Sequence, residues 1–180
     1  MAAGQQVPFR KLMFRPTTVT QALLNIFTSS RYRVEGDSML PALADREYVL
    51  LARTRFPFNR LSRGDLVVFK DPVGNDDFYV KRIVGLPDEE IRLEGGLVYL
   101  NGALLEEIYP TILPREGDEA VREWWTGPDE YFVMGDNRRS SRDSRTFGPV
   151  NKRLILGRVW FRYWPPRAWG PVSAAQRTRP

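Results

Sequence analysis

From residue 31 onward, the hydrophobic positions fall into short runs separated by turn residues. Apolar residues, many of them β-branched or aromatic, cluster at 48–51, 66–69, 78–84, 96–100, 131–134 and 155–164. Runs of this length and composition are typical of β-strands. Residues 91–93 and 97–99, joined through Glu94-Gly95-Gly96, predict a hairpin. The pattern therefore predicts a mainly β fold of antiparallel sheets, with residues 155–164 forming either a last strand pair or one long strand.

The two ends of the chain and one internal segment break this pattern. Apolar residues recur at helical spacing over 19–27, which predicts a short helix within an N-terminal segment of residues 1–30. The apolar run is shorter than the ~18–20 residues of a membrane span, so the helix either lies on a membrane surface or docks onto the domain. Residues 31–164 form the predicted β domain, with an acidic, proline-containing cap inserted at about 103–129 and a tail at 165–180.

Composition narrows the possible chemistry. The 180 residues include no histidine and no cysteine, which leaves no thiol nucleophile, no disulfide and few ways to bind zinc. We therefore expect no metal and no cofactor. The net charge of +5 is spread along the chain and no nucleic-acid-binding motif accompanies it, so we expect no nucleic-acid partner. A serine nucleophile in this chain has no histidine base, and a lysine that loses its charge is the side chain left to take the proton.

Two residues are candidates for such a pair. Ser38 lies in a turn between Gly36 and Pro41, where backbone can approach a substrate closely. Lys81 lies in the predicted strand at 78–84, where alternation places it on the opposite face from Arg82. If its face is buried, desolvation favours the neutral amine. Spacing alone favours the other arrangement, with Lys81 exposed and Arg82 facing the core.

A polar loop at residues 135–148 is the third candidate. It combines small and charged residues, among them Asp136, Arg138, Ser141, Asp143 and Arg145. Such a loop is either a flexible tip or a hydrogen-bonded brace, in which a serine could hold a lysine amine in place. Composition does not distinguish the two.

Taken together, five stretches resemble the type I signal peptidases, membrane-bound serine proteases with a Ser/Lys dyad. The likeness runs from about residue 34 to about residue 164 and is carried by residues 36–41, 63–69, 79–87, 98–102 and 134–145. It implies a signal-peptidase-like barrel in which Ser38 is the nucleophile, Lys81 the general base and the Ser38 backbone N–H an oxyanion donor. It further implies that Ser141 orients the lysine, and that Asp143 and Arg145 brace the site with Asp136 and Arg138 nearby.

The resemblance also implies a substrate and a location. Family substrates are the signal peptides of exported preproteins, cut after small residues at the outer face of the cytoplasmic membrane. Some members have a serine two residues before the nucleophile, where this chain has Gly36, and most have a membrane-spanning helix that residues 19–27 do not match. Contact with the lipid surface would then use the N-terminal helix and apolar residues such as Met39, Phe56 and Phe58.

Two alternatives remain at this point. One is a soluble Ser/Lys protease with a specialised or self-cleaving substrate, as in the self-cleaving repressors. Those proteins carry a helix-turn-helix and a self-cleavage site, and neither is evident before Ser38. The other is a non-catalytic β domain that binds peptides or lipid.

Overall fold

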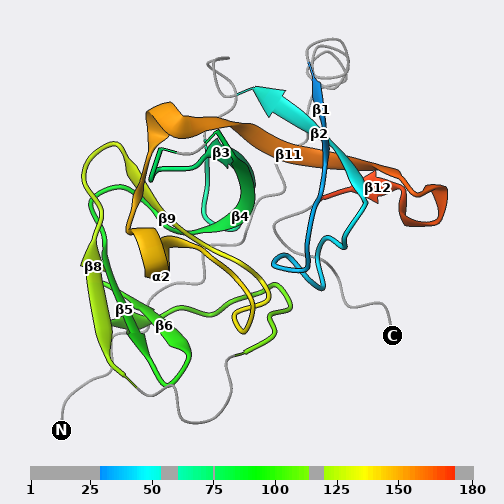
Figure 1. Cartoon of the computed structure of the whole chain (residues 1–180). Coiled ribbons are helices and arrows are strands. Elements are labelled where there is room, and N and C mark those ends of the chain that lie inside the picture. Colours follow the sequence, from blue (N-terminus) through cyan, green and yellow to red (C-terminus); the bar gives the residue numbers. More distant parts are fainter. Residues whose placement is uncertain (1–28, 54–60, 75, 114–119, 173–180) are drawn as a thin grey trace, which may run out of the picture.

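The computed structural model describes residues 29–53, 61–74, 76–113 and 120–172. These residues form two antiparallel sheets, as the strand pattern predicted (Figure 1). The helix predicted at 19–27 lies outside the described residues, and so do Phe56 and Phe58. Of the N-terminal segment 1–30, only residues 29 and 30 are described.

The larger sheet contains eight strands and holds most of the predicted runs. Its neighbours follow the order β1-β2-β11-β3-β4-β9-β10, and β12 pairs with β11. The strands are β1 (Ser30–Arg33), β2 (Tyr48–Arg53), β3 (Leu66–Lys70), β4 (Phe78–Gly85), β9 (Glu130–Met134), β10 (Val150–Asn151), β11 (Ile155–Trp164) and β12 (Gly170–Pro171). Pairings among these described strands run as an open path from β1 to β10 and do not close a barrel.

The smaller sheet has the order β7-β6-β5-β8, and lies at the opposite end of the molecule from β1 and β2 (Figure 1). Its strands are β5 (Glu90–Glu94), β6 (Leu97–Leu100), β7 (Ala103–Leu104) and β8 (Arg122–Trp125). The predicted hairpin is confirmed, since Glu94 pairs with Leu97 across a two-residue loop. Gly95 and Gly96 both have positive φ, 56° and 78°, the backbone that a tight hairpin turn requires. The expected cap at 103–129 supplies β7 and β8 to this sheet.

Short helical turns complete the described fold. They are α2 (Ser144–Phe147), η1 (Lys152–Leu154) and η2 (Pro166–Ala168). Residues 155–164 form one long strand, and the chain beyond it turns back so that β12 pairs with β11 at Phe161 and Arg162. Folded structure thus continues into the segment expected to be a tail.

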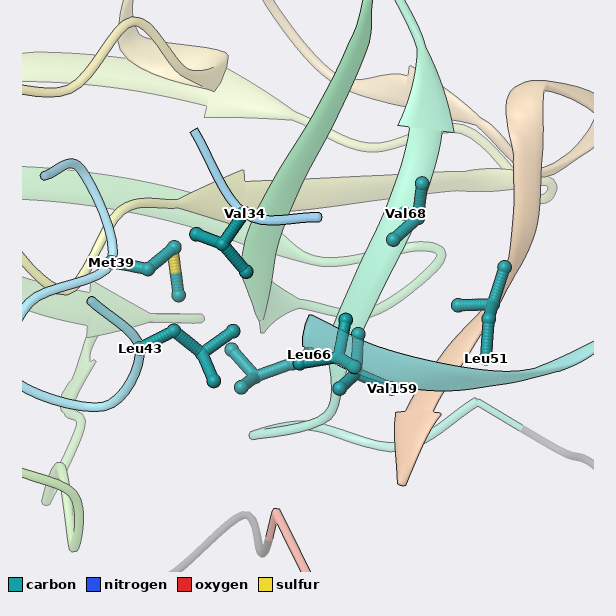
Figure 2. Close-up of a cluster of buried hydrophobic side chains, with 8 residues drawn as sticks. Val34, Met39, Leu43, Leu51, Leu66, Val68 and Val159 are labelled. Atoms are coloured by element: carbon teal, nitrogen blue, oxygen red, sulfur yellow. The ribbon is translucent and has the colours of Figure 1, made fainter. Parts of the chain in front are cut away.

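The hydrophobic core anchors the turn that carries Ser38. Met39 and Leu43, in that turn, are 1% and 0% exposed. Figure 2 shows their side chains gathered with those of Val34 and Leu66. The expectation that Met39 contacts lipid is wrong, because its side chain is in the core. Burying the residue next to Ser38 fixes the turn against the sheet.

Strand β4 is buried on both of its faces, and this decides where Lys81 lies. Tyr79 and Ile83 pack with one apolar cluster, whereas Val80 and Val84 pack with two others. The predicted alternation is therefore present. A strand between β3 and β9 in the middle of a sheet can have apolar cover on both sides, which the sequence pattern did not indicate.

Candidate active site

Ser38 and Lys81 meet although 43 residues separate them in sequence. The Lys81 Nζ lies 2.6 Å from Ser38 Oγ and 3.0 Å from the carbonyl oxygen of Val80. Lys81 is 3% exposed, so the arrangement with an exposed lysine is wrong. Arg82 is also buried, on the other face of β4. In the ammonium form Lys81 donates a hydrogen bond to Ser38, whereas a neutral amine in the same position can accept the serine proton.

The electrostatics around Lys81 favour the neutral amine. Burial lowers its pKa from the ordinary 10.5 to about 8. The carboxylates of Asp143 and Asp136 act in the opposite direction, and the Arg145 guanidinium adds to the lowering. A lysine with a pKa near 8 is partly neutral at physiological pH and can still be protonated during a reaction, which is the requirement for a general base.

Asp143 and Arg145 brace the loop, one of the two arrangements that its composition left open. Arg145 donates from Nε and Nη2 to the two carboxylate oxygens of Asp143, each at 2.8 Å, and the Gly135 backbone N–H donates to Asp143 at 2.9 Å. Burial alone would raise the pKa of Asp143, but the hydrogen bonds and charge of Arg145, with the Gly135 N–H, bring it below its ordinary value. This loop is a hydrogen-bonded brace rather than a flexible tip.

Asp136 and Arg138 secure the same loop from its other side. Asp136 accepts hydrogen bonds of 2.7 and 2.6 Å from Arg82, whose Nη1 also donates to the Gly64 carbonyl at 2.8 Å. Arg138 forms an ion pair with Glu107, and its Nε donates to the Gly135 carbonyl at 3.0 Å. These contacts tie the loop to β4 and to the chain that follows β7.

Ser141 lies beside Gly135 and the Ser38 backbone. A Cβ added at Gly135 would come within 2.2 Å of Ser141 Oγ and 2.6 Å of the Ser38 carbonyl oxygen. The Ser141 hydroxyl is buried and forms no standard hydrogen bond among the described residues, although it lies close enough to Asp143 to help lower that pKa. Gly135 thus leaves the space that Ser141 and Ser38 share.

Other residues that were not among the sequence candidates join the site, although Asn137 lies in the motif at 134–145. Asn137 donates from its backbone N to the Ser38 carbonyl at 3.1 Å and from Nδ2 to the Asp37 carbonyl at 3.2 Å. The Tyr109 ring lies under the Arg82 guanidinium, 4.2 Å from its centroid, and Glu107 pairs with Arg138. An arginine placed in a buried loop requires an acidic partner, but nothing in the sequence identifies Glu107 as that partner.

Among the described residues, no helix is both long enough and apolar enough to cross a membrane. Within the same part of the chain, no three acidic side chains are grouped so that they could hold a metal ion.

Known proteins are similar in sequence to this chain over most of its length. The chain matches the family described as signal peptidase, peptidase S26, over residues 10–164. It is 37% identical over 156 residues to signal peptidase I of Bacillus caldolyticus, covering 80% of this chain and 84% of that one. Signal peptidase I S of Bacillus subtilis is 36% identical, with 82% and 83% covered. A solved signal peptidase I from Enterococcus faecalis aligns with a TM-score of 0.49 at 28% identity, covering 56% of this chain and 97% of that chain.

Proposed function

The chain belongs to the signal peptidase family, peptidase S26, and is a serine endopeptidase that removes signal peptides; we propose that Ser38 is its nucleophile and Lys81 its general base. The observation that carries this assignment is the 2.6 Å contact between Lys81 Nζ and Ser38 Oγ. It is supported by the burial that lowers the Lys81 pKa to about 8. A fold pays for a desolvated lysine mainly where chemistry uses it.

In the proposed reaction, neutral Lys81 takes the proton of the Ser38 hydroxyl as Oγ attacks the scissile carbonyl carbon. The tetrahedral intermediate collapses when the lysine ammonium gives that proton to the leaving amine nitrogen, and an acyl-enzyme on Ser38 remains. Lys81 then activates a water molecule, which attacks the ester carbonyl and releases the second product. The serine recovers its proton from Lys81, so the dyad returns to its starting state.

The oxyanion of both tetrahedral intermediates would bind the Ser38 backbone N–H. One such donor typically contributes about 3 kcal/mol to transition-state stabilisation. Gly36, two residues earlier, has no side chain and adds no hydroxyl donor. The oxyanion hole of this enzyme would therefore rest on the Ser38 backbone donor.

The loop at 135–148 would hold the dyad residues in position and would not itself bind the substrate. The Asp143–Arg145 pair places a carboxylate and a guanidinium near Lys81 with opposing effects on its pKa. Ser141 fills the space beside Gly135 and would limit how Lys81 can move. Asp136 and Arg138 would act through the loop, because their ion pairs connect it to Arg82 and Glu107.

We also propose that the enzyme works on exported preproteins at the outer face of the cytoplasmic membrane, in contact with lipid. Two tryptophans at the end of β11 and beyond it, Trp164 and Trp169, are 51% and 66% exposed. Tryptophan is enriched where proteins meet the membrane–water interface. Sedimentation of the full chain with liposomes tests this contact, and recovery of all protein in the supernatant would argue against it.

A preprotein cleavage assay tests the dyad. Ser38→Ala and Lys81→Met should each abolish release of the signal peptide, with circular dichroism like that of the wild type. Ser140→Ala and Lys70→Met serve as matched controls, because both residues are more exposed than the dyad residues they match, and both variants should cleave normally. Near-normal turnover by either dyad variant would exclude the mechanism.

A further inference from the structure

The backbone N–H of Ser38 belongs to the same peptide unit as the Asp37 carbonyl. That peptide is trans, and a trans peptide is planar with its C=O and N–H pointing in opposite directions. Whatever holds the Asp37 oxygen on one side therefore decides where the Ser38 N–H points on the other. The orientation of the proposed oxyanion donor can thus be set without any contact to its hydrogen.

Asn137 holds this peptide unit and the next one. Its Nδ2 donates to the Asp37 carbonyl at 3.2 Å, although 100 residues separate the two in sequence. Its backbone N–H donates to the Ser38 carbonyl at 3.1 Å. The Asp37 oxygen also accepts from the Leu40 N–H at 3.2 Å. The two carbonyls that flank Ser38 are consequently both bound by one residue of the opposite loop.

Asn137 is itself fixed from both sides. The neighbouring Asp136 is 0% exposed and bound to Arg82. Backbone hydrogen bonds link the segment after β7 to both neighbours of Asn137: Ile112 N donates to Asp136 O at 2.8 Å, and Arg138 N donates to Ile112 O at 2.9 Å. The Asn137 Oδ1 is buried without a partner among the described residues. The contact with the Asp37 carbonyl defines which way the Asn137 amide points, because the reverse orientation would place Oδ1 against the Asp37 oxygen.

We propose that Asn137 is a positioning residue whose side-chain amide fixes the Asp37–Ser38 peptide plane and so directs the Ser38 N–H toward the substrate oxyanion. This inference rests on the proposed roles of Ser38 and its backbone donor. The benefit arises where negative charge develops on the substrate oxygen, so the contact should stabilise the transition state more than the bound substrate.

Asn137→Ala removes the side-chain contact and leaves the backbone N–H that binds the Ser38 carbonyl. We expect kcat for preprotein cleavage to fall between about tenfold and a hundredfold, less than for loss of an oxyanion donor itself, while KM changes by less than about twofold. A peptide aldehyde, which forms a tetrahedral adduct with a serine, should lose affinity by the same factor as kcat. The pH midpoint of activity should stay unchanged, because the surroundings of Lys81 are intact.

Asn137→Asp is the second variant, because it keeps the size of the side chain but has no amide donor, and it should lose at least as much as Asn137→Ala. Asn151→Ala is the matched control: Asn151 caps η1 by accepting from Arg153 N, and its loss should leave kcat unchanged. A kcat within twofold of wild type for Asn137→Ala or Asn137→Asp, a loss confined to KM in either variant, or a shifted pH midpoint for Asn137→Ala would overturn the proposal. Cleavage by Ser38→Ala would instead show that the nucleophile was assigned wrongly, and this inference would fall with it.

Discussion

Burial of Lys81 should make the folded protein less stable than it would be without the charge. The side chain lies in the sheet interior at 3% exposure, and its pKa is lowered from 10.5 to about 8 chiefly by desolvation. Lys81→Met removes the ammonium and keeps an unbranched apolar chain of similar length. We expect this variant to gain stability relative to wild type at neutral pH, and that gain to disappear as the pH rises.

The pH range follows from the two pKa values. The unfolded chain keeps the lysine proton up to about pH 10.5, whereas the folded chain releases it near pH 8. Between these values the unfolded state binds more protons, so wild-type stability rises with pH. At ~1.36 kcal/mol per pH unit the full interval corresponds to about 3 kcal/mol, most of which is reached by pH 10. Any loss of packing or hydrogen bonds in the variant adds an offset that does not change with pH.

Urea unfolding of both proteins at pH 6.5, 8, 9 and 10 measures the difference directly. The free energy of unfolding of Lys81→Met minus that of wild type should fall by about 2–3 kcal/mol from the first pH to the last. Lys70→Met is the control: the Lys70 side chain is 45% exposed, so its removal relieves no buried charge and its difference should stay level. A level difference for Lys81→Met as well would refute the argument that burial sets this pKa.

Three further results are expected. The kcat/KM for preprotein cleavage should rise with pH, reach half its maximum near pH 8 and then level off, because the base must be neutral; a constant rate from about pH 6 to 9 would contradict a titrating lysine. Gly135→Ala should lower preprotein cleavage at least about a hundredfold, because the added Cβ would lie 2.2 Å from Ser141 Oγ. Gly127→Ala is its control and should cleave nearly normally, because its Cβ would meet only a flexible Glu130 carboxylate at 3.3 Å. Arg145→Met should destabilise the fold by about 3–5 kcal/mol in urea unfolding, because it leaves the Asp143 carboxylate buried without its ion-pair partner. Adding Asp143→Leu should restore part of that stability. A double variant no more stable than Arg145→Met would show that the buried carboxylate is not the cause.

Most strands were predictable, because each of these is a short local run with turn residues at its ends, but no run was predicted for β1, β7, β8, β10 or β12. The hairpin of β5 and β6 could be placed in the same way, since Gly95-Gly96 specifies its turn. The order of the larger sheet could not, because β11 inserts between β2 and β3, and this pairing depends on contacts far apart in sequence. The smaller sheet shows the same limit, since β8 joins β5 across a segment that looked like a separate cap.

The site was predictable as a set of motifs but not as a geometry. Alternation placed Lys81 and Arg82 on opposite faces of β4, yet it cannot show burial when both faces are covered. Spacing alone therefore favoured an exposed Lys81 with Arg82 in the core, which is wrong because both side chains are buried. Asn137 was part of a recognised motif, but its contact with the Asp37 carbonyl depends on two loops meeting in space, which no local pattern encodes.

The surroundings of Lys81 also show how a chain without histidine could use a lysine as the proposed base. Asp143 and Asp136 raise its pKa and Arg145 lowers it, so the charges beside the lysine act on that pKa in opposite directions. Each carboxylate is in turn tied to a guanidinium, Asp143 to Arg145 and Asp136 to Arg82. Desolvation is the largest single influence on that pKa, and it lowers it. The ion pairs can therefore hold the loop rigidly around the proposed dyad while burial still favours the neutral lysine that the proposed reaction requires.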